Sequence, residues 1–244
     1  MNLRLRLLPD EPGAPFPAVE SALREPDGLL AVGGDLSPAR LLNAYGHGIF
    51  PWYSDGQPIL WWSPDPRIVF RTAGGIRLSA RFRRSLRNSP WVVRADTAFA
   101  EVIGACARTP RKDQGGTWIT GEMEAAYVEL HRLGHAHSVE VFEGDRLVGG
   151  VYGVAIGRMF FGESMFSGET GGSKVALAGL AHRLQEWGWP LIDAQVANPH
   201  LLSMGAEYVS RADFVLLIEH LAAMPGGTGS WTAEFGDLEA PLLA

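Results

Sequence analysis

A carboxylate and a primary amide stand two residues apart in Pro190-Leu-Ile-Asp-Ala-Gln-Val-Ala-Asn-Pro-His200. The apolar residues predict a short strand that ends at the turn signal Asn198-Pro199. Because side chains alternate between the faces of a strand, Asp193 and Gln195 are expected on one face, about 7 Å apart, with an apolar face opposite. The pair could belong to a functional site, or the strand could simply have one solvated face.

A second acidic side chain follows another apolar run. Met159-Phe-Phe-Gly-Glu-Ser-Met-Phe166 is interpreted as a strand that stops at its glycine, which places Glu163 directly after the strand end. Two apolar strands, each delivering acid or amide groups near its end, indicate a functional site.

The whole chain has the composition of an ordinary globular protein. It has 244 residues, of which 46% are hydrophobic and 20% charged, and its net charge is −6. No apolar run reaches the roughly 18 residues that span a membrane, and the N-terminal residues lack a signal-peptide pattern. The single cysteine, Cys106, excludes an internal disulfide and a cysteine metal cluster. We expect a cytoplasmic protein without a membrane partner.

Metal and nucleotide motifs are incomplete in this sequence. His135 and His137 lack acidic or histidine partners at metal-binding spacing, so no metal site is expected. Gly171-Gly-Ser-Lys174 resembles a phosphate-binding loop but lacks the Gly-Lys-[Ser/Thr] ending. Lys174 could be a surface lysine or a phosphate contact. No Gly-x-Ser-x-Gly nucleophile motif occurs.

Basic residues are concentrated in one part of the sequence. Eight arginines and no acidic residue lie between Pro66 and Ala95. Such a stretch is typical of phosphate binding, although it could also be a solvated face balanced by acids from elsewhere. Four of these arginines lie in a basic helix expected over residues 79–88: Arg81, Arg83, Arg84 and Arg87.

An aromatic segment precedes this basic stretch. Five aromatic residues and three prolines lie between Phe50 and Pro64. They could form a small aromatic core under a proline-braced loop, or a surface on which an unpaired base stacks.

The remaining pattern predicts an α+β fold, because apolar strands in a meander alternate with helices. The likeliest domain boundary is Pro64 to Pro66, which gives a small N-terminal domain of residues 1–65 and a larger domain of residues 66–244. Residues 1–20 are expected to be an irregular arm, and the tail after Met224 to be loosely packed. Helices are expected over residues 36–45, 79–88, 98–108, 119–134, 173–188 and 214–223.

Several long motifs, in order, resemble the leucyl/phenylalanyl-tRNA–protein transferase family. They are GLLAVGGDLSPARLLNAYGHGIFPWY, PILWWSPDPR, GTWIT, GHAHSVEV, LVGGVYGVA, FFGESMFS, SKVAL and LIDAQVANPH. The resemblance implies a larger domain with a GNAT-type acyltransferase fold beside a smaller N-terminal α/β domain. It also implies transfer of leucine, phenylalanine or sometimes methionine from aminoacyl-tRNA to an N-terminal Arg or Lys, which marks the acceptor protein for degradation by the N-degron pathway.

The resemblance also assigns roles to individual residues. Asp193 and Gln195 match a pair credited with catalysis, and Glu163 matches a residue linked to the acceptor's basic N-terminus. Trp52 matches an aromatic that lies at the terminal adenosine of the tRNA, and Trp118 matches the aromatic of GTWIT. Positions lining the pocket for the transferred side chain are matched by Val151, Met165, Leu180, Leu184 and Ile192.

The implied reaction is aminolysis of an activated ester, which requires no cofactor, ATP or metal. Its main demand is alignment, which can contribute about 7–11 kcal/mol. Under this hypothesis Asp193 orients Gln195 and accepts or relays a proton, Gln195 holds the amine or the ester carbonyl, and Glu163 selects a cationic side chain. The basic stretch, together with Lys174, would hold the acceptor stem through its phosphates.

Two other functions remain open from the sequence. An acyl-CoA-dependent N-acyltransferase would need a pyrophosphate loop, for which residues 162–167 are the candidate, although they carry an acid where donors are needed. A non-catalytic RNA-binding protein would explain the arginines and aromatics but not the combination of Glu163, Asp193 and Gln195.

Overall fold

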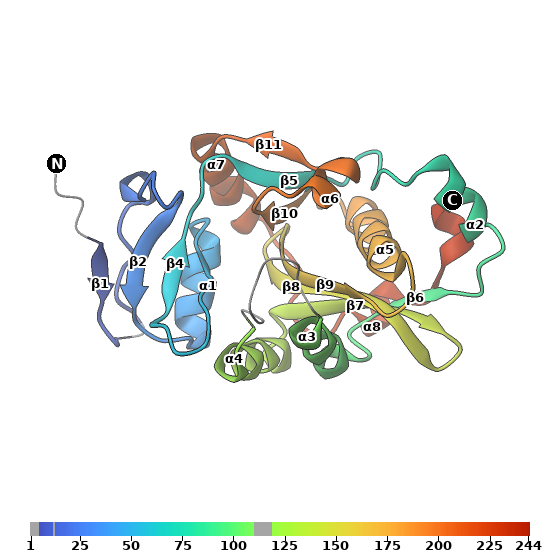
Figure 1. The fold of residues 1–244 in the computed structure, drawn as a ribbon, viewed down its shortest axis with the longest axis horizontal. Coiled ribbons are helices and arrows are strands. Elements are labelled where there is room, and N and C mark those ends of the chain that lie inside the picture. The colour runs from blue at the N-terminus through green and yellow to red at the C-terminus, as the bar shows by residue number, and fades with distance from the viewer. Residues whose placement is uncertain (1–4, 12, 110–118) are drawn as a thin grey trace.

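The computed structural model describes residues 5–11, 13–109 and 119–244. Their strands form two sheets, a four-stranded sheet in the order β1-β2-β4-β3 and an eight-stranded sheet in the order β11-β5-β10-β9-β8-β7-β6-β12 (Figure 1). The small sheet comprises β1 Arg6–Leu8, β2 Leu29–Gly33, β3 Phe50–Pro51 and β4 Leu60–Trp62. The large sheet comprises β5 Arg67–Arg71, β6 Val92–Ala95, β7 Ala136–Glu143, β8 Arg146–Ile156, β9 Met159–Ser167, β10 Leu191–Gln195, β11 Glu207–Val209 and β12 Leu238–Glu239.

The helices separate these strands along the chain, which confirms the predicted α+β class. They are α1 Pro38–Gly46, α2 Ala80–Leu86, α3 Phe99–Arg108, α4 Gly121–Arg132, α5 Gly172–Glu186, α6 Pro199–Ser203, α7 Arg211–Ala222 and α8 Thr232–Phe235, with the short 3-10 helices Val19–Ser21 and Ala240–Leu243. Ser37 caps the N-terminus of α1, because its side chain accepts a hydrogen bond from the Arg40 N–H.

In the large sheet a meander joins a parallel pair of strands. Strands β7, β8 and β9 pair antiparallel, whereas β10 pairs parallel with β9 and antiparallel with β5. Two apolar clusters cover the two faces. One includes side chains of α1, α3, α4 and α7, and the other includes the apolar face of α5. Figure 1 shows α3 and α4 on the opposite side of β8 and β9 from α5.

The N-terminal residues form more structure than the irregular arm that we expected from the sequence. Strand β1 pairs in parallel with β2, with Arg6 opposite Ala31 and Leu8 opposite Gly33. A three-residue strand is too short to give a periodic signal, and it is stabilised by its partner rather than by its own pattern. The expectation for this segment was therefore wrong at residues 6–8.

The tail after Met224 is also better packed than expected. The side chains of Trp231, Phe235 and Leu238 are at most 3% exposed, and β12 adds to the edge of the large sheet through β6. The Gly/Pro-rich residues 225–229 therefore only connect α7 to α8, and the apolar residues that follow them pack into the core. Figure 1 shows the C-terminus beside α2.

Strand β9 does not stop at Gly162, contrary to the sequence expectation. It continues to Ser167. Its pairing with β8 is irregular at one point, because the register shifts between Tyr152 and Gly153. Glu163 thus projects from the middle of a strand, which fixes its backbone more firmly than a loop would.

The expected domain boundary at Pro64 to Pro66 falls between the last strand of the small sheet and the first strand of the large one. One apolar cluster nevertheless extends across it and includes Tyr45 and Trp61 together with Val69 and Phe214. The division into two domains remains a prediction. Within the described ranges, no helix is both long and apolar enough to cross a membrane.

Candidate active site

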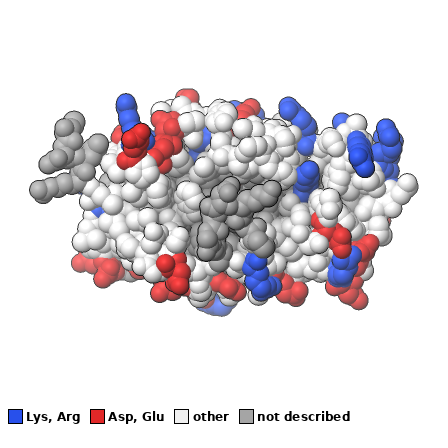
Figure 2. Space-filling view, in the orientation of Figure 1, with Lys and Arg blue, Asp and Glu red and all other residues white. Residues whose placement is uncertain are grey.

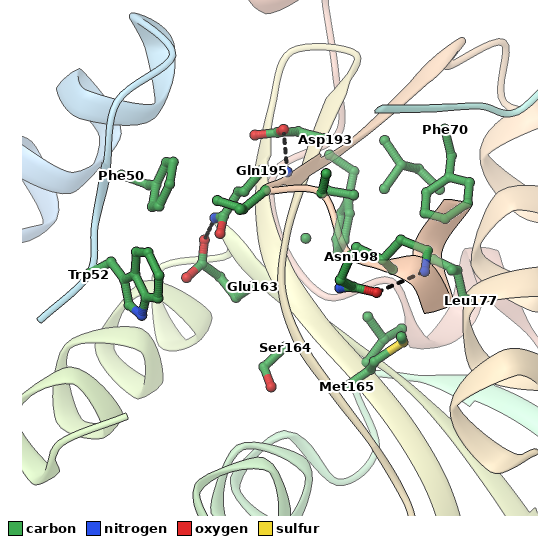
Figure 3. Close-up of a pocket in the computed structure, with 18 of the residues that line it drawn as sticks. Phe50, Trp52, Phe70, Glu163, Ser164, Met165, Leu177, Asp193, Gln195 and Asn198 are labelled. Atoms are coloured by element: carbon green, nitrogen blue, oxygen red, sulfur yellow. Dashed lines mark hydrogen bonds between the residues drawn. The ribbon is translucent and has the colours of Figure 1, made fainter. Parts of the chain in front are cut away.

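A cavity of about 430 Å³ opens where β9 and β10 lie side by side and the edge of the small sheet approaches them. Its lining combines aromatic side chains from β3 and its continuation, polar side chains from β9 and β10, and apolar side chains from the interior of the large sheet. Figure 3 shows Phe50 and Trp52 on one side of Glu163 and Gln195, with Phe70, Leu177 and Met165 on the other. The polar groups thus lie between an aromatic and an apolar region.

The structure brings Asp193 and Gln195 together, but not by simple alternation along a strand. The pairing of β10 with β5 shifts register between them, and Gln195 adopts a left-handed backbone with φ 60°. A non-glycine residue in this region is uncommon and is held by its surroundings. Here the Gln195 N–H donates to Asp193 Oδ1 over 2.9 Å. This register shift is a β-bulge. After it, Val196 is exposed and does not continue the apolar face that alternation predicts.

Glu163 lies in a cage of hydrogen-bond donors. Its Oε1 accepts from Tyr45 over 2.7 Å and from Gln195 Nε2 over 2.6 Å, and its Oε2 accepts from Tyr127 over 3.0 Å. The two tyrosine hydroxyls also hydrogen-bond to each other. Tyr45 belongs to α1, Tyr127 to α4 and Gln195 to β10. The Glu163 carboxylate on β9 therefore connects two helices and two neighbouring strands.

Burial determines the electrostatics of this cage. Desolvation raises the pKa of Glu163 to about 7, and the nearby Asp193 charge adds to this rise, whereas the hydrogen bonds from Tyr45, Tyr127 and Gln195 oppose it. Desolvation and the Glu163 charge also hold the pKa values of Tyr45 and Tyr127 well above their ordinary value, so both hydroxyls keep their protons and remain donors. Glu163 can therefore change its charge near neutral pH.

Asp193 is held by an arginine that the sequence analysis had assigned to the basic stretch. Arg67 donates from Nε to Oδ1 over 2.9 Å and from Nη2 to Oδ2 over 2.7 Å, and both side chains are almost completely buried. Arg71 pairs with Glu207 and Arg94 with Asp237 at the surface. Three of the eight arginines are thus balanced by acids from elsewhere, as one of the two interpretations expected.

The apolar region of the cavity could receive a hydrophobic side chain. Of the residues expected there, Val151, Met165 and Ile192 line the cavity, whereas Leu180 and Leu184 do not. Leu180 and Leu184 are fully buried in the core cluster on the α5 face. They follow Leu177 along the same helical face, and only the first turns of α5 reach the cavity. Further apolar residues that line the cavity include Phe70, Phe160, Leu177 and Leu201.

The aromatic segment serves as both core and cavity wall. Trp61 is fully buried and donates from Nε1 to the Gly33 carbonyl, whereas Trp52 is half-buried and lines the cavity. The Trp62 indole donates to the Trp52 carbonyl over 2.7 Å, which fixes the backbone at this position. Trp118, which matches the aromatic of GTWIT, lies outside the described residues.

The basic helix lies at the end of the molecule that also carries the C-terminus. Figure 2 shows blue Lys and Arg side chains gathered there. Arg81, Arg83, Arg84 and Arg87 are exposed, and no ion pair involves them within the described ranges. Lys174 is half-buried, with its ammonium group 5.8 Å from the centre of the Phe82 ring. Unlike Arg71 and Arg94, these four arginines have no acidic partner among the described residues, so their charges are available to an anionic ligand.

The residues that hold the site from a distance are not evident from the sequence. The pattern around Tyr45 and Tyr127 indicates only helices, and Arg67 belongs to the basic stretch. Arg67 directly precedes the apolar residues Ile68-Val-Phe70. This position at the start of an apolar strand is the sequence signal that its side chain is buried. Phe50 and Leu177 also line the cavity without having been assigned to it.

Hydrogen-bonded acid and amide groups lie between an apolar cavity and an aromatic edge in this site. Residues 69–219 match the family described as leucyl/phenylalanyl-tRNA protein transferase, and residues 34–65 match the N-terminal domain of that family. The chain belongs to the leucyl/phenylalanyl-tRNA protein transferase family. It is therefore an aminoacyltransferase, which confirms the resemblance seen in its motifs.

Individual relatives agree with this assignment. The leucyl/phenylalanyl-tRNA–protein transferase of Xanthomonas euvesicatoria pv. vesicatoria (strain 85-10) is 70% identical over 230 residues, covering 94% of this chain and 92% of that protein. The protein of the same name from Xylella fastidiosa (strain 9a5c) is 61% identical over 231 residues, covering 95% of each chain. A solved structure of a functionally unknown conserved protein from Staphylococcus epidermidis ATCC 12228 has a TM-score of 0.42 at 9% identity, covering 75% of this chain and 68% of that chain.

Proposed function

We propose that the chain transfers leucine or phenylalanine, and also methionine, from aminoacyl-tRNA to the N-terminal Arg or Lys of acceptor proteins. The α-amine attacks the ester carbonyl, the bond from this carbon to the ribose oxygen breaks, and a peptide bond forms. The proton lost by the amine balances the one gained by the ribose oxygen. The observation that carries this proposal is the apolar cavity that ends at the joined side chains of Glu163 and Gln195.

Gln195 and Asp193 are proposed to align the reacting groups. The amide nitrogen of Gln195 is engaged by Glu163, so its carbonyl oxygen is the end that accepts a hydrogen bond from the incoming amine. Both oxygens of Asp193 accept from Arg67, and Oδ1 also accepts from the Gln195 backbone. These contacts support the orienting role expected for Asp193 rather than proton transfer by it.

Glu163 is proposed to select acceptors with a basic first residue. Its carboxylate is buried, so a cationic side chain that reaches it would gain a strong, weakly screened interaction. The tyrosine hydroxyls hold the carboxylate in place while its charge is unpaired. An uncharged acceptor side chain would leave this buried carboxylate without a cation.

The donor is proposed to bind across the cavity and the basic helix. The transferred side chain would occupy the apolar region lined by Val151, Met165 and Ile192, while the terminal adenosine stacks near Trp52. The exposed arginines of α2 and Lys174 would contact tRNA phosphates, which are the same for every tRNA sequence. The proposal places the enzyme in the cytoplasm, where charged tRNA occurs, and its products in the N-degron pathway.

We propose a GNAT-type fold for the larger domain because a parallel pair, β9 and β10, ends an antiparallel meander at the site. Use of acyl-CoA is not favoured. Residues 162–167 would have to form the pyrophosphate loop, yet they belong to a strand that pairs with β8, and they carry the buried Glu163. A pyrophosphate would meet a carboxylate there rather than free N–H donors.

The proposal is tested by transfer of labelled leucine from leucyl-tRNA to a peptide beginning with Arg, beside the same peptide beginning with Ala. We expect label on the Arg peptide only, and its loss in Asp193→Ala. Tight tRNA binding without label on either peptide would reject the transfer function and favour an RNA-binding protein. Titration with CoA provides the second control, for which no binding is expected.

A further inference from the structure

Arg67 differs from the other arginines of the basic stretch in being almost completely enclosed. Its side chain is 1% exposed, whereas Arg71, four residues further along the same strand, is 55% exposed. A buried guanidinium group must have hydrogen-bond partners, because an unpaired charge in the interior is strongly destabilising. Its partners therefore indicate what the residue does.

The guanidinium group forms a paired contact with Asp193. Nε and Nη2 donate to the two different oxygens of the carboxylate, which is a planar fork that lysine cannot reproduce. This contact fixes the orientation of the carboxylate as well as its position. The same Oδ1 accepts the Gln195 N–H and so holds the left-handed turn that directs the Gln195 side chain to Glu163.

Arg67 also connects the large sheet to the aromatic edge of the cavity. Nη1 donates to the Gly48 carbonyl over 3.1 Å. The guanidinium carbon lies 4.7 Å from the ring centre of Phe50 and 4.7 Å from that of Phe214. Phe50 belongs to β3 of the small sheet and lines the cavity, and Phe214 belongs to α7. One side chain thus fixes Asp193 relative to the wall on the opposite side of the site.

We propose that Arg67 is a positioning residue for acyl transfer, which holds Asp193 and Gln195 at a fixed distance from the aromatic wall of the cavity. This inference rests on the proposed function, since Gln195 must face the reacting ester for its position to affect the rate. It goes beyond the roles expected from the sequence, where Arg67 was a candidate for phosphate binding.

A purely structural role makes a different prediction. A buried ion pair contributes little net stability relative to a well-packed apolar pair, although removing one partner alone is strongly destabilising. If Arg67 served only to neutralise Asp193, a folded Arg67→Lys variant, which keeps both charges, should be fully active. If it positions Asp193, the loss of fork geometry should lower kcat even in a folded chain.

The test compares Arg67→Lys, Arg67→Met, Asp193→Asn and the double variant Arg67→Met/Asp193→Asn in the full-length chain. Transfer from leucyl-tRNA to an Arg-starting peptide is measured as kcat and KM, and folding is checked by urea unfolding. Arg71→Met is the matched control, because it removes an exposed arginine of the same strand.

We expect Arg67→Lys to fold, to keep KM for leucyl-tRNA within about threefold, and to lose about 100-fold in kcat, the effect of misplacing a reacting group by about 1 Å. The double variant should fold, because both charges are removed together, and should be no slower than Asp193→Asn alone. Arg71→Met should match the wild-type chain.

Wild-type kcat in Arg67→Lys would overturn the inference, as would losses that multiply in the double variant, because Arg67 would then not act through Asp193. If Arg67→Met or Asp193→Asn does not fold, Arg67→Lys decides alone. An inactive wild-type chain would reject the proposed function and this inference with it, whereas an active wild-type chain with an equally active Arg67→Lys would reject this inference only.

Discussion

Gln195 donates a hydrogen bond from its side-chain Nε2 to Oε1 of Glu163 over 2.6 Å. The two residues lie on neighbouring parallel strands, β10 and β9. The contact joins the residue expected to align the amine to the residue expected to bind the acceptor's first side chain. Under the proposed function, this hydrogen bond would couple the alignment of the amine to the choice of acceptor.

This coupling predicts that Gln195→Ala lowers kcat about 100-fold, because the amine loses its alignment and Glu163 loses a donor. KM for leucyl-tRNA should change much less, since the tRNA contacts lie elsewhere. Steady-state transfer to an Arg-starting peptide measures both constants. Gln185→Ala, an exposed glutamine on α5, is the control and should behave as the wild-type chain. Equal kcat in the two variants would contradict the assigned role.

Local patterns in the sequence located the strands and helices that carry the site. The apolar strands that carry Glu163, Asp193 and Gln195 could be predicted, because each strand pattern depends on neighbours within a few residues. The partners could not be predicted in this way. Tyr45 meets Glu163 across 118 residues of sequence, and Arg67 meets Asp193 across 126.

Two details of the cavity show why periodicity alone is insufficient. Helical spacing places Leu177, Leu180 and Leu184 on one face of α5, but it does not tell which part of that face meets a cavity and which meets packed core. Strand alternation likewise failed at Gln195, because a bulge depends on the hydrogen bond from its backbone to Asp193. The limit of the cavity along α5 is set by tertiary packing, whereas the bulge involves a local hydrogen bond that alternation does not include.

The α5 helix provides a matched pair for testing donor selection. Leu177 lines the cavity, whereas Leu180, one turn later, is fully buried in the core. Leu177→Ala should enlarge the cavity and raise the ratio of phenylalanine to leucine transfer by about tenfold, within the range that pocket size can discriminate. Leu180→Ala should lower the free energy of unfolding by about 2–5 kcal/mol and leave this ratio unchanged. Competition between phenylalanyl- and leucyl-tRNA gives the ratio, and an altered ratio in Leu180→Ala alone would contradict the placement.

The exposed arginines of α2 should determine how tRNA binding depends on salt. Each phosphate contact removed lowers the slope of log K against log salt concentration by about 1. The double variant Arg81→Ala/Arg84→Ala should therefore reduce the slope by about 2 units. Binding titrations at several salt concentrations measure it. Arg132→Ala removes an exposed arginine of α4 that pairs with Glu129 and should leave the slope unchanged. The same decrease in both proteins would argue against a specific tRNA surface on α2.

The C-terminal segment should contribute to stability rather than to catalysis. Trp231 is 3% exposed, stacks on His137 with ring centres 3.9 Å apart, and donates its backbone N–H to Asp96 over 2.7 Å. Trp231→Ala should lower the free energy of unfolding by about 3–5 kcal/mol because it leaves a large cavity. Its kcat at 25 °C should remain that of the wild-type chain. Urea unfolding measures the loss, with the exposed Leu216→Ala as control, and a change below 1 kcal/mol would show that the segment is loosely held.

The raised pKa of Glu163 predicts how stability depends on pH. In the folded protein this pKa is about 7, against about 4.3 in an unfolded chain. Between these values the folded chain holds a proton that the unfolded chain has lost, so the free energy of unfolding decreases as pH rises from about 4.3 to about 7. Glu163→Gln carries no titrating group at this position and should escape that decrease.

The variant should therefore gain stability relative to the wild-type chain as pH rises from 4 to 8, by a difference of the order of 3 kcal/mol, since one pKa unit corresponds to about 1.36 kcal/mol. Urea unfolding at both pH values measures the difference. Glu140, whose pKa burial also raises to about 7, is present in both proteins and cancels in the comparison. Glu219→Gln, an exposed glutamate of α7, should show no such gain. A difference that does not change with pH would mean that the pKa of Glu163 is the same in the folded and unfolded chains, because the hydrogen bonds from Tyr45, Tyr127 and Gln195 offset its desolvation.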